Sequence, residues 1–144
     1  MKNLLVAITA VVLGIAGTTQ QVSAHGTHDA DAILPVLEAG QRIFGENKVQ
    51  EAKAKWPALR ERFPDIELRL IGPLQSNKTA DAVALFDVIH GLDRPSLLGA
   101  LTKAMDAAGR RLPCFIQVNI GAEEQKGGCA IADTPALIAA ARDA

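Results

Sequence analysis

Short apolar runs alternate with amphipathic stretches from about residue 30 to the end of the chain. Four runs have the length and alternation of strands, at residues 42–47, 66–72, 88–93 and 113–120. Four longer stretches carry apolar residues at helical spacing, at residues 49–63, 79–86, 94–109 and 134–144. Strands that alternate with amphipathic helices predict an α/β fold with a parallel sheet and right-handed crossovers.

A further helix is expected before the first of these strands. Thr27 or Asp29 can cap its start, and Gly40 is suited to end it in the left-handed conformation. Pro35 is expected to kink this helix or shift its start, because proline lacks the N–H that a helix interior needs. For the same reason, Pro57 is expected to divide the next helix into two pieces.

The first 24 residues differ from the rest of the chain. Lys2 precedes an uncharged apolar run over residues 4–17, and a polar segment then places Val22 and Ala24 at the small-residue positions of a cleavage site. This pattern predicts a signal peptide cut after Ala24, which leaves a domain of residues 25–144 for export to the periplasm or medium. The apolar run is short for a membrane span, which needs roughly 20 apolar residues. A buried N-terminal strand or helix is the alternative.

Composition narrows the function classes. The 144 residues are 49% hydrophobic and 22% charged, with a net charge of -1, which describes one soluble domain with no electrostatic preference for nucleic acid or anionic membrane. Two cysteines are too few for a disulfide scaffold, and their spacing matches no zinc motif. We expect Cys114 to be a buried strand residue and Cys129 to lie in a loop, where an exported chain can oxidise it.

Polar residues gather where the predicted strands end. They are Glu46, Asn47, Gln75, Ser76, Asn77, His90, Asp93, Gln117 and Asn119. In an α/β barrel the carboxyl ends of the strands carry the ligand site, and a closed eight-stranded barrel takes roughly 200 residues or more. The chain therefore has room for about half of such a barrel.

Three stretches resemble the pyridoxal-phosphate homeostasis protein family, the single-domain relatives of the alanine racemase barrel. They are "LEAGQRIFGENKVQEAKAKWPALRERFPDIELRLIGPLQSNK", "VALFDVIHGLDRP" and "IQVNIGAEEQKGG". The resemblance implies a type III pyridoxal-phosphate fold, a TIM-type (β/α)8 barrel that is about half present. It also implies a cytoplasmic carrier or homeostasis role for pyridoxal 5′-phosphate, without established catalytic turnover.

The same resemblance implies that this chain lacks the residue that holds the cofactor covalently. In the family, the first strand ends in a valine-serine-lysine run, and that lysine forms the Schiff base. Aligned on Thr27, this sequence has Gly26 at the lysine position and His25 at the serine position. The signal-like segment stands in place of the first barrel strand, and the later strands that hold the phosphate lie beyond Ala144. An internal aldimine is therefore not expected at Gly26.

The resemblance places Asn47, Ile71, Gly72 and Asn77 around the cofactor pocket. Asn47 can instead be a turn residue that satisfies local backbone, and Asn77 can cap the following helix. Lys78 and Lys126 are the candidates for a substitute Schiff base, although a productive lysine needs a lowered pKa and a phosphate clamp. His90 is either a pocket residue or a satisfied core histidine.

A cluster around the leader junction has the composition of a metal site. His25, His28, Asp29 and Asp31 can all ligate a metal, but the run from Thr27 also fits a helix start, where acidic residues favour the positive end of the dipole. Because no closed ligand set is visible, we expect no metal.

Three functions remain for such a chain. The first is a non-enzymatic pyridoxal-phosphate carrier; the second is an exported half-barrel without cofactor; the third, an amino-acid racemase-like enzyme, is the least favoured. A half-barrel exposes edges at the strands near Phe44 and Ile116, which predicts self-association, for example as a dimer that completes a barrel. Apart from the cofactor and a second copy of the chain, no partner is expected.

Overall fold

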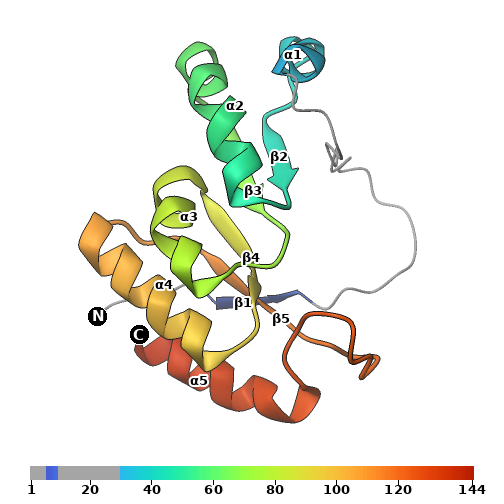
Figure 1. Cartoon of the computed structure of the whole chain (residues 1–144), viewed down its shortest axis with the longest axis vertical. Helices are drawn as coiled ribbons and strands as arrows, with labels where there is room; N and C mark the ends of the chain where they lie inside the picture. The colour runs from blue at the N-terminus through green and yellow to red at the C-terminus, as the bar shows by residue number, and fades with distance from the viewer. Residues whose placement is uncertain (1–5, 10–29) are drawn as a thin grey trace.

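The computed structural model of the chain describes residues 6–9 and 30–144, and Figure 1 shows its α/β architecture. Five parallel strands form one sheet in the order β1-β5-β4-β3-β2. The strands are β1 (Val6–Thr9), β2 (Ile43–Glu46), β3 (Glu67–Leu70), β4 (Val88–Leu92) and β5 (Cys114–Gln117). The helices are α1 (Ala30–Glu38), α2 (Val49–Arg62), α3 (Thr79–Leu85), α4 (Pro95–Ala108) and α5 (Thr134–Asp143), with short 3-10 turns η1 (Ser76–Lys78) and η2 (Ile131–Asp133).

The four strands predicted after the leader and the helices between them are all present, and the predicted parallel sheet is confirmed. Consecutive helices pack against each other from α1 to α5, so they form a layer in chain order beside the sheet. Gly40 and Gly109 follow α1 and α4 with positive φ, as the predicted helix ends require. No helix in residues 30–144 is long and apolar enough to cross a membrane.

The core lies between the sheet and this helix layer. On each strand every second residue points toward the helices, which is the two-residue period of a strand. The buried strand residues include Phe44, Leu68, Leu70, Ile89 and Ile116, and the helices bury Trp56, Val83, Leu97 and Leu101 against them. Side chains on the opposite face are less buried, as in half of a barrel whose interior is open.

The prediction that Pro57 divides α2 is wrong. The helix runs unbroken from Val49 to Arg62. Pro57 lies on the exposed side of the helix, whereas Trp56 and Leu59 on the other side are buried in the core. Packing of that buried side holds the helix together, so the chain tolerates the single hydrogen bond that proline removes.

The two edges of the sheet differ from the expectation. β2 is an edge strand, as predicted, but β5 is not, because β1 pairs with it in parallel, with Ala7 opposite Phe115. Residues 6–9 therefore form a strand within the leader-like segment. This strand adds to the β5 side of the sheet and not beside β2.

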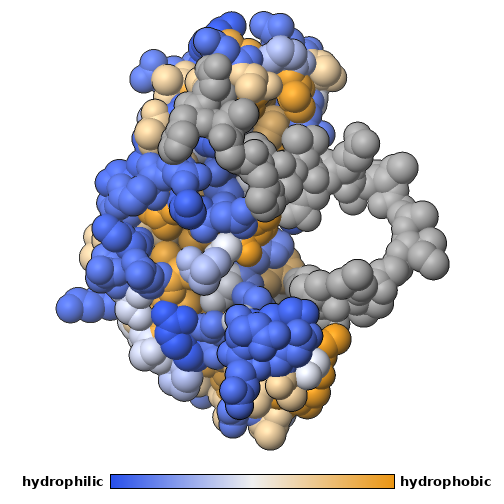
Figure 2. All heavy atoms as spheres, turned by 45° about the vertical axis from the view of Figure 1, so that its right-hand side comes forward, coloured by the Kyte–Doolittle hydropathy of each residue, from blue (hydrophilic) through white to orange (hydrophobic). Residues whose placement is uncertain are grey.

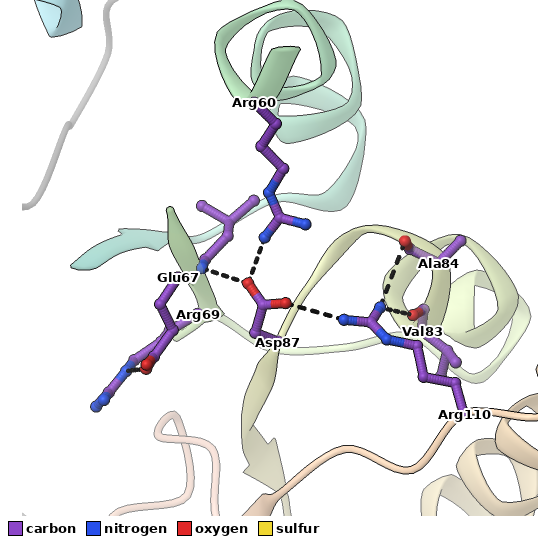
Figure 3. Close-up of polar contacts among 8 residues, drawn as sticks. Arg60, Glu67, Arg69, Val83, Ala84, Asp87 and Arg110 are labelled. Atoms are coloured by element: carbon purple, nitrogen blue, oxygen red, sulfur yellow. Dashed lines mark hydrogen bonds and ion pairs between the residues drawn. The ribbon is translucent and has the colours of Figure 1, made fainter. Parts of the chain in front are cut away.

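A carboxylate at the start of β4 ties four elements together, as Figure 3 shows. Asp87 accepts hydrogen bonds from Arg60 of α2, from Arg110 Nη2 at 2.9 Å and from the Leu68 backbone N–H at 2.7 Å. Arg110 also donates to the carbonyl of Val83 at 2.5 Å. These contacts fix the amino-terminal side of the sheet, opposite to the strand ends that carry a ligand site in barrels.

Replacing Asp87 with asparagine is expected to lower the free energy of unfolding by about 1 to 2 kcal/mol, because two guanidinium groups lose their counter-charge in a partly exposed site. Urea unfolding followed by circular dichroism measures the change. Asp65→Asn is the matched control: Asp65 pairs with Arg42 at 2.7 Å but its side chain is 64% exposed, so its effect is expected to stay below about 0.5 kcal/mol. Equal effects of the two substitutions would contradict this account.

Candidate functional site

The carboxyl ends of β2, β3 and β4 meet at unusually close range. A Cβ on Gly72 would lie 2.2 Å from the Asn47 carbonyl oxygen, and a Cβ on Gly91 would lie 2.9 Å from the Gly72 carbonyl oxygen. The Ile71 N–H donates to the Glu46 carbonyl at 2.9 Å, which continues the pairing of β3 with β2 to this end. Glycine at 72 and 91 thus allows three backbone segments to pack without side chains between them.

The structure brings together three of the four predicted cofactor-binding residues. Asn47, Ile71 and Gly72 lie at the adjoining ends of β2 and β3, where Asn47 and Ile71 are half-buried and Gly72 is buried. Asn77 is exposed and lies in η1, several residues beyond the strand. The alternative role of Asn77 as a helix cap is not realised, because Lys78 occupies the N-cap of α3 and no side-chain cap bond forms there.

Glu46 does not belong to this ligand end, although it was grouped with the polar strand ends. Its side chain points toward α2 and is only 3% exposed. Glu46 Oε1 lies 2.6 Å from Lys55 Nζ and accepts a hydrogen bond from Trp56 Nε1 at 2.7 Å. The three residues form a buried polar cluster behind the sheet, which was not predicted from the sequence.

The loops above the strand ends are held by arginine and amide contacts. Arg94 donates to the Leu74 carbonyl at 2.8 Å and pairs with Asp93 at 2.6 Å, which connects the loop after β3 to the start of α4. Sequence reasoning had noted Asp93 as a strand-end residue but missed Arg94. A hydrogen bond to a backbone carbonyl 20 residues away has no signal in local sequence.

The loop after β5 is organised by Asn119. Its side-chain amide donates to the Glu123 carbonyl at 2.8 Å and its Oδ1 accepts from the Glu123 N–H at 3.3 Å. Ala122 adopts a positive φ of 49° within this turn. Asn119, Lys126 and Gly128 border an open hollow of about 440 Å³ beside the loop. The hollow is broad and mostly lined by a surface loop, so it gives the strand ends no enclosed cavity.

His90 lies on the sheet face that points away from the helices. Its ring stacks on Phe115 of the neighbouring strand, with centroids 4.5 Å apart. Nε2 is buried without a hydrogen-bond partner among the described residues. Burial lowers the pKa of His90, and the nearby Arg69 guanidinium lowers it further, against a smaller opposite effect of Glu67. The neutral imidazole is thus favoured on this open inner face.

The described lysines do not fit a covalent pyridoxal-phosphate site. A Schiff-base lysine needs a deprotonated amine held close to a phosphate clamp. Lys48 pairs with Glu51 at 2.8 Å, and this bond raises its pKa. Lys126 pairs with Glu123 at 2.7 Å, and Lys55 is committed to Glu46 behind the sheet. Lys78 lies at the N-cap of α3. Gly26, which the resemblance places at the lysine position, lies outside the described residues.

The remaining candidates carry no chemistry that the structure supports. Cys114 lies in β5 and Cys129 lies between β5 and η2, as expected, and both are buried and free. Burial raises the pKa of the Cys114 thiol to about 12. Of the residues around the leader junction that could ligate a metal, His25, His28 and Asp29 lie outside the described residues, and the described part of the chain contains no group of three metal-ligating side chains.

The chain is similar in sequence to proteins that are about twice as long as the part of them it matches. The family model of the alanine racemase N-terminal domain matches residues 23–144. The pyridoxal phosphate homeostasis proteins of Vibrio alginolyticus and Escherichia coli K12 are 37% and 39% identical over 113 and 115 residues, which are 77% and 79% of this chain. These alignments cover 48% and 49% of the two relatives, so the chain spans about half the length of the curated relatives it matches.

Solved structures agree with the sequence comparison. PipY of Synechococcus elongatus, solved with PLP bound, superposes with a TM-score of 0.73 and 38% identity over 83% of this chain and 55% of PipY. An unknown protein from Bifidobacterium adolescentis gives a TM-score of 0.70 at 30% identity, over 76% of this chain and 48% of that protein. The chain therefore belongs to the alanine racemase N-terminal domain family, among relatives that are pyridoxal phosphate homeostasis proteins, and it holds part of their TIM-type barrel.

Proposed function

We propose that this chain descends from a pyridoxal 5′-phosphate carrier and that it holds no cofactor through a Schiff base. The observation that carries the proposal is that Lys48, Lys55 and Lys126 are in ion pairs; the family resemblance adds that Gly26 aligns with the Schiff-base lysine. The relatives' names and the PLP bound to PipY support the carrier ancestry. Asn47, Ile71 and Gly72 remain as one wall of the ancestral pocket.

The proposal also assigns no catalytic turnover to the chain. An amino-acid racemase needs the cofactor amine and a second acid–base group close to the substrate. In the described residues, the titratable groups near the strand ends are used in structural pairs, such as Asp93 with Arg94. His90 is stacked on Phe115 and favours its neutral form. The chain is therefore proposed to be non-enzymatic.

The test is titration of the purified chain with pyridoxal 5′-phosphate, followed by borohydride reduction and peptide mass mapping. We expect no saturable aldimine absorbance and only scattered labelling of exposed lysines, because no described lysine has both an unpaired amine and a phosphate clamp. PipY, which was solved with PLP bound, is the positive control for the absorbance and reduction steps.

Two substitutions sharpen the titration. Saturable labelling at one position that disappears in Lys78→Arg or Lys126→Arg would show a substitute site, and the covalent part of the proposal would then be wrong. Arginine keeps the positive charge but forms no aldimine under these conditions. A loss of labelling in either variant would thus report the amine itself and not a change in net charge.

A further inference from the structure

The outer edge of β2 is open in the part of the chain that the structure describes. The Glu67 N–H donates to the Arg42 carbonyl at 2.9 Å, so the backbone of Arg42 faces β3. Residues of a parallel strand face its two neighbours alternately, so the backbone of Ile43 faces outward. The Ile43 carbonyl accepts a hydrogen bond from the Gln41 side-chain amide at 2.7 Å. The Gln41 side chain therefore binds a backbone carbonyl at the outer edge of β2 that a neighbouring parallel strand could bind instead.

The opposite edge, β5, demonstrably accepts a parallel strand. β1 pairs with it over four residues, with Ala7 opposite Phe115. The Ile89 N–H donates to the Pro113 carbonyl at 3.0 Å, which means that Pro113 faces β4 and that the next residue, Cys114, faces β1. The β5 edge is thus available to any strand that runs parallel to the sheet and displaces β1.

We propose that the β2 edge binds the β5 edge of a second copy of this chain, so that two half-barrels close one eight-stranded barrel. The sheet from β2 to β5 is entirely parallel, and its helices form one layer in chain order. A two-fold rotation about an axis that runs in the direction of the strands, in front of the open inner face, places β5 of the second copy beside β2, and β2 of that copy beside β5. This head-to-tail pairing closes at two copies, keeps every strand parallel and leaves all helices outside.

The inner face that this closure encloses is compatible with burial. Glu67 and Arg69, its charged residues on β3, form an ion pair at 2.6 Å, so together they bring no net charge. His90 favours its neutral form and is stacked on Phe115. In Figure 2, which brings forward the side to the right of α2 and α3 in Figure 1, hydrophobic residues show between hydrophilic ones near the middle of the molecule.

β1 acts in this proposal as a competitor for the β5 edge. It is only four residues long, and it lies in the segment that the sequence predicts to be removed by cleavage after Ala24. Such a cleavage takes away the strand that covers β5 and leaves two bare parallel edges on each copy. Monomer and dimer are therefore linked through the pairing of Val6–Thr9 with β5.

The experiment measures the monomer–dimer equilibrium of the full chain by sedimentation velocity over a range of concentrations. Ala7→Pro removes the N–H that faces Cys114 in the parallel pattern, so it weakens the docking of β1. We expect this variant to dimerise with a Kd about tenfold lower than that of the unmodified chain. An unchanged equilibrium in Ala7→Pro would overturn the competition between β1 and the second copy.

A second substitution tests the β2 edge. In the Ala7→Pro background, Ile43→Pro removes an outward-facing N–H without touching the β2–β3 pairing, and we expect the dimer to be lost. Ile43→Ala is the matched control, because it shortens the same 39%-exposed side chain but keeps the N–H; it should preserve the dimer. Far-ultraviolet circular dichroism checks that each variant is folded, and Ile43→Lys replaces Ile43→Pro if proline unfolds the chain.

The outcomes distinguish a dimer that closes the barrel from dimers or larger species that form through other surfaces. A dimer that resists both Ile43→Pro and Ile43→Lys uses another surface, which overturns the proposal. Growth to larger species with concentration means that the edges join in an open chain and not in a two-fold ring, which also overturns it. Only a dimer that Ala7→Pro strengthens and Ile43→Pro abolishes supports the barrel. None of these readings depends on whether the chain binds pyridoxal 5′-phosphate.

Discussion

Replacing Lys55 with methionine is expected to lower the free energy of unfolding by about 3 to 5 kcal/mol. Lys55 and Glu46 are 6% and 3% exposed, and Lys55 Nζ lies 2.6 Å from Glu46 Oε1. Removal of the ammonium leaves the Glu46 carboxylate in the core with Trp56 Nε1 as its remaining described donor. A buried carboxylate without its counter-charge has lost its hydration and keeps only this one hydrogen bond to offset the loss, so the cost far exceeds that of breaking a surface pair.

Two variants on the same elements isolate the buried charge as the cause. Lys53→Met, two residues earlier on α2, breaks a pair with Asp81 at 2.8 Å whose side chains are 47% and 37% exposed; its effect is expected to be below about 1 kcal/mol. The double variant Glu46→Gln/Lys55→Met should be more stable than Lys55→Met alone, because the amide oxygen still accepts from Trp56 and carries no charge.

Urea unfolding followed by circular dichroism and by tryptophan fluorescence measures these changes. Trp56 is the only tryptophan of the chain and is fully buried beside the pair, so its emission reports this site directly. If Lys55→Met and Lys53→Met shift the unfolding midpoint equally, or if Glu46→Gln gives no recovery in the double variant, the buried pair is not the source of the stability.

Much of the fold could be predicted because its signals are local. The apolar runs around Phe44, Leu70, Ile89 and Ile116 identified four strands, and the glycines at 40 and 109 marked two helix ends correctly. The prediction for Pro57 was wrong because it considered only the low helix propensity of proline. It did not consider that Pro57 lies on the exposed side of the helix. Burial of Trp56 and Leu59 on the opposite side outweighs that propensity.

The orientation of Glu46 was also readable in principle. Phe44 is an evident core residue, and a side chain two positions later on a strand points to the same face. Glu46 therefore had to face the helix layer, and Lys55 on the following helix was a candidate partner. The position of a polar residue at a strand end indicated the ligand site, but the alternation along the strand decides which residues reach it.

Other features depend on contacts that no local pattern contains. Asp87 joins Arg60 and Arg110, which lie 27 and 23 residues away in the chain. The pairing of β1 with β5 joins residues 6–9 to a strand more than 100 residues later. A leader-like apolar run has the same composition as an edge strand, so local composition gives no sign of the pairing of residues 6–9 with β5.

Replacing Gly72 with alanine is expected to lower the free energy of unfolding by about 3 kcal/mol. The added Cβ would lie 2.2 Å from the carbonyl oxygen, 2.7 Å from Cα and 2.8 Å from the carbonyl carbon of Asn47. All three are backbone atoms, so no side-chain rotation relieves the overlap. β2 and β3 must instead move apart at the end where Asn47, Ile71 and Gly72 meet.

Alanine substitutions at three glycines are expected to differ in their loss of stability, and urea unfolding midpoints measure the order. Gly91→Ala places its Cβ 2.9 Å from the Gly72 carbonyl oxygen, so its cost is expected to be smaller, at about 1 to 2 kcal/mol. Gly99 is exposed on α4 with nothing within 4 Å of an added Cβ, so Gly99→Ala should be neutral or stabilise the chain by up to about 1 kcal/mol. If Gly72→Ala is no worse than Gly99→Ala, the strand ends are looser than the structure shows.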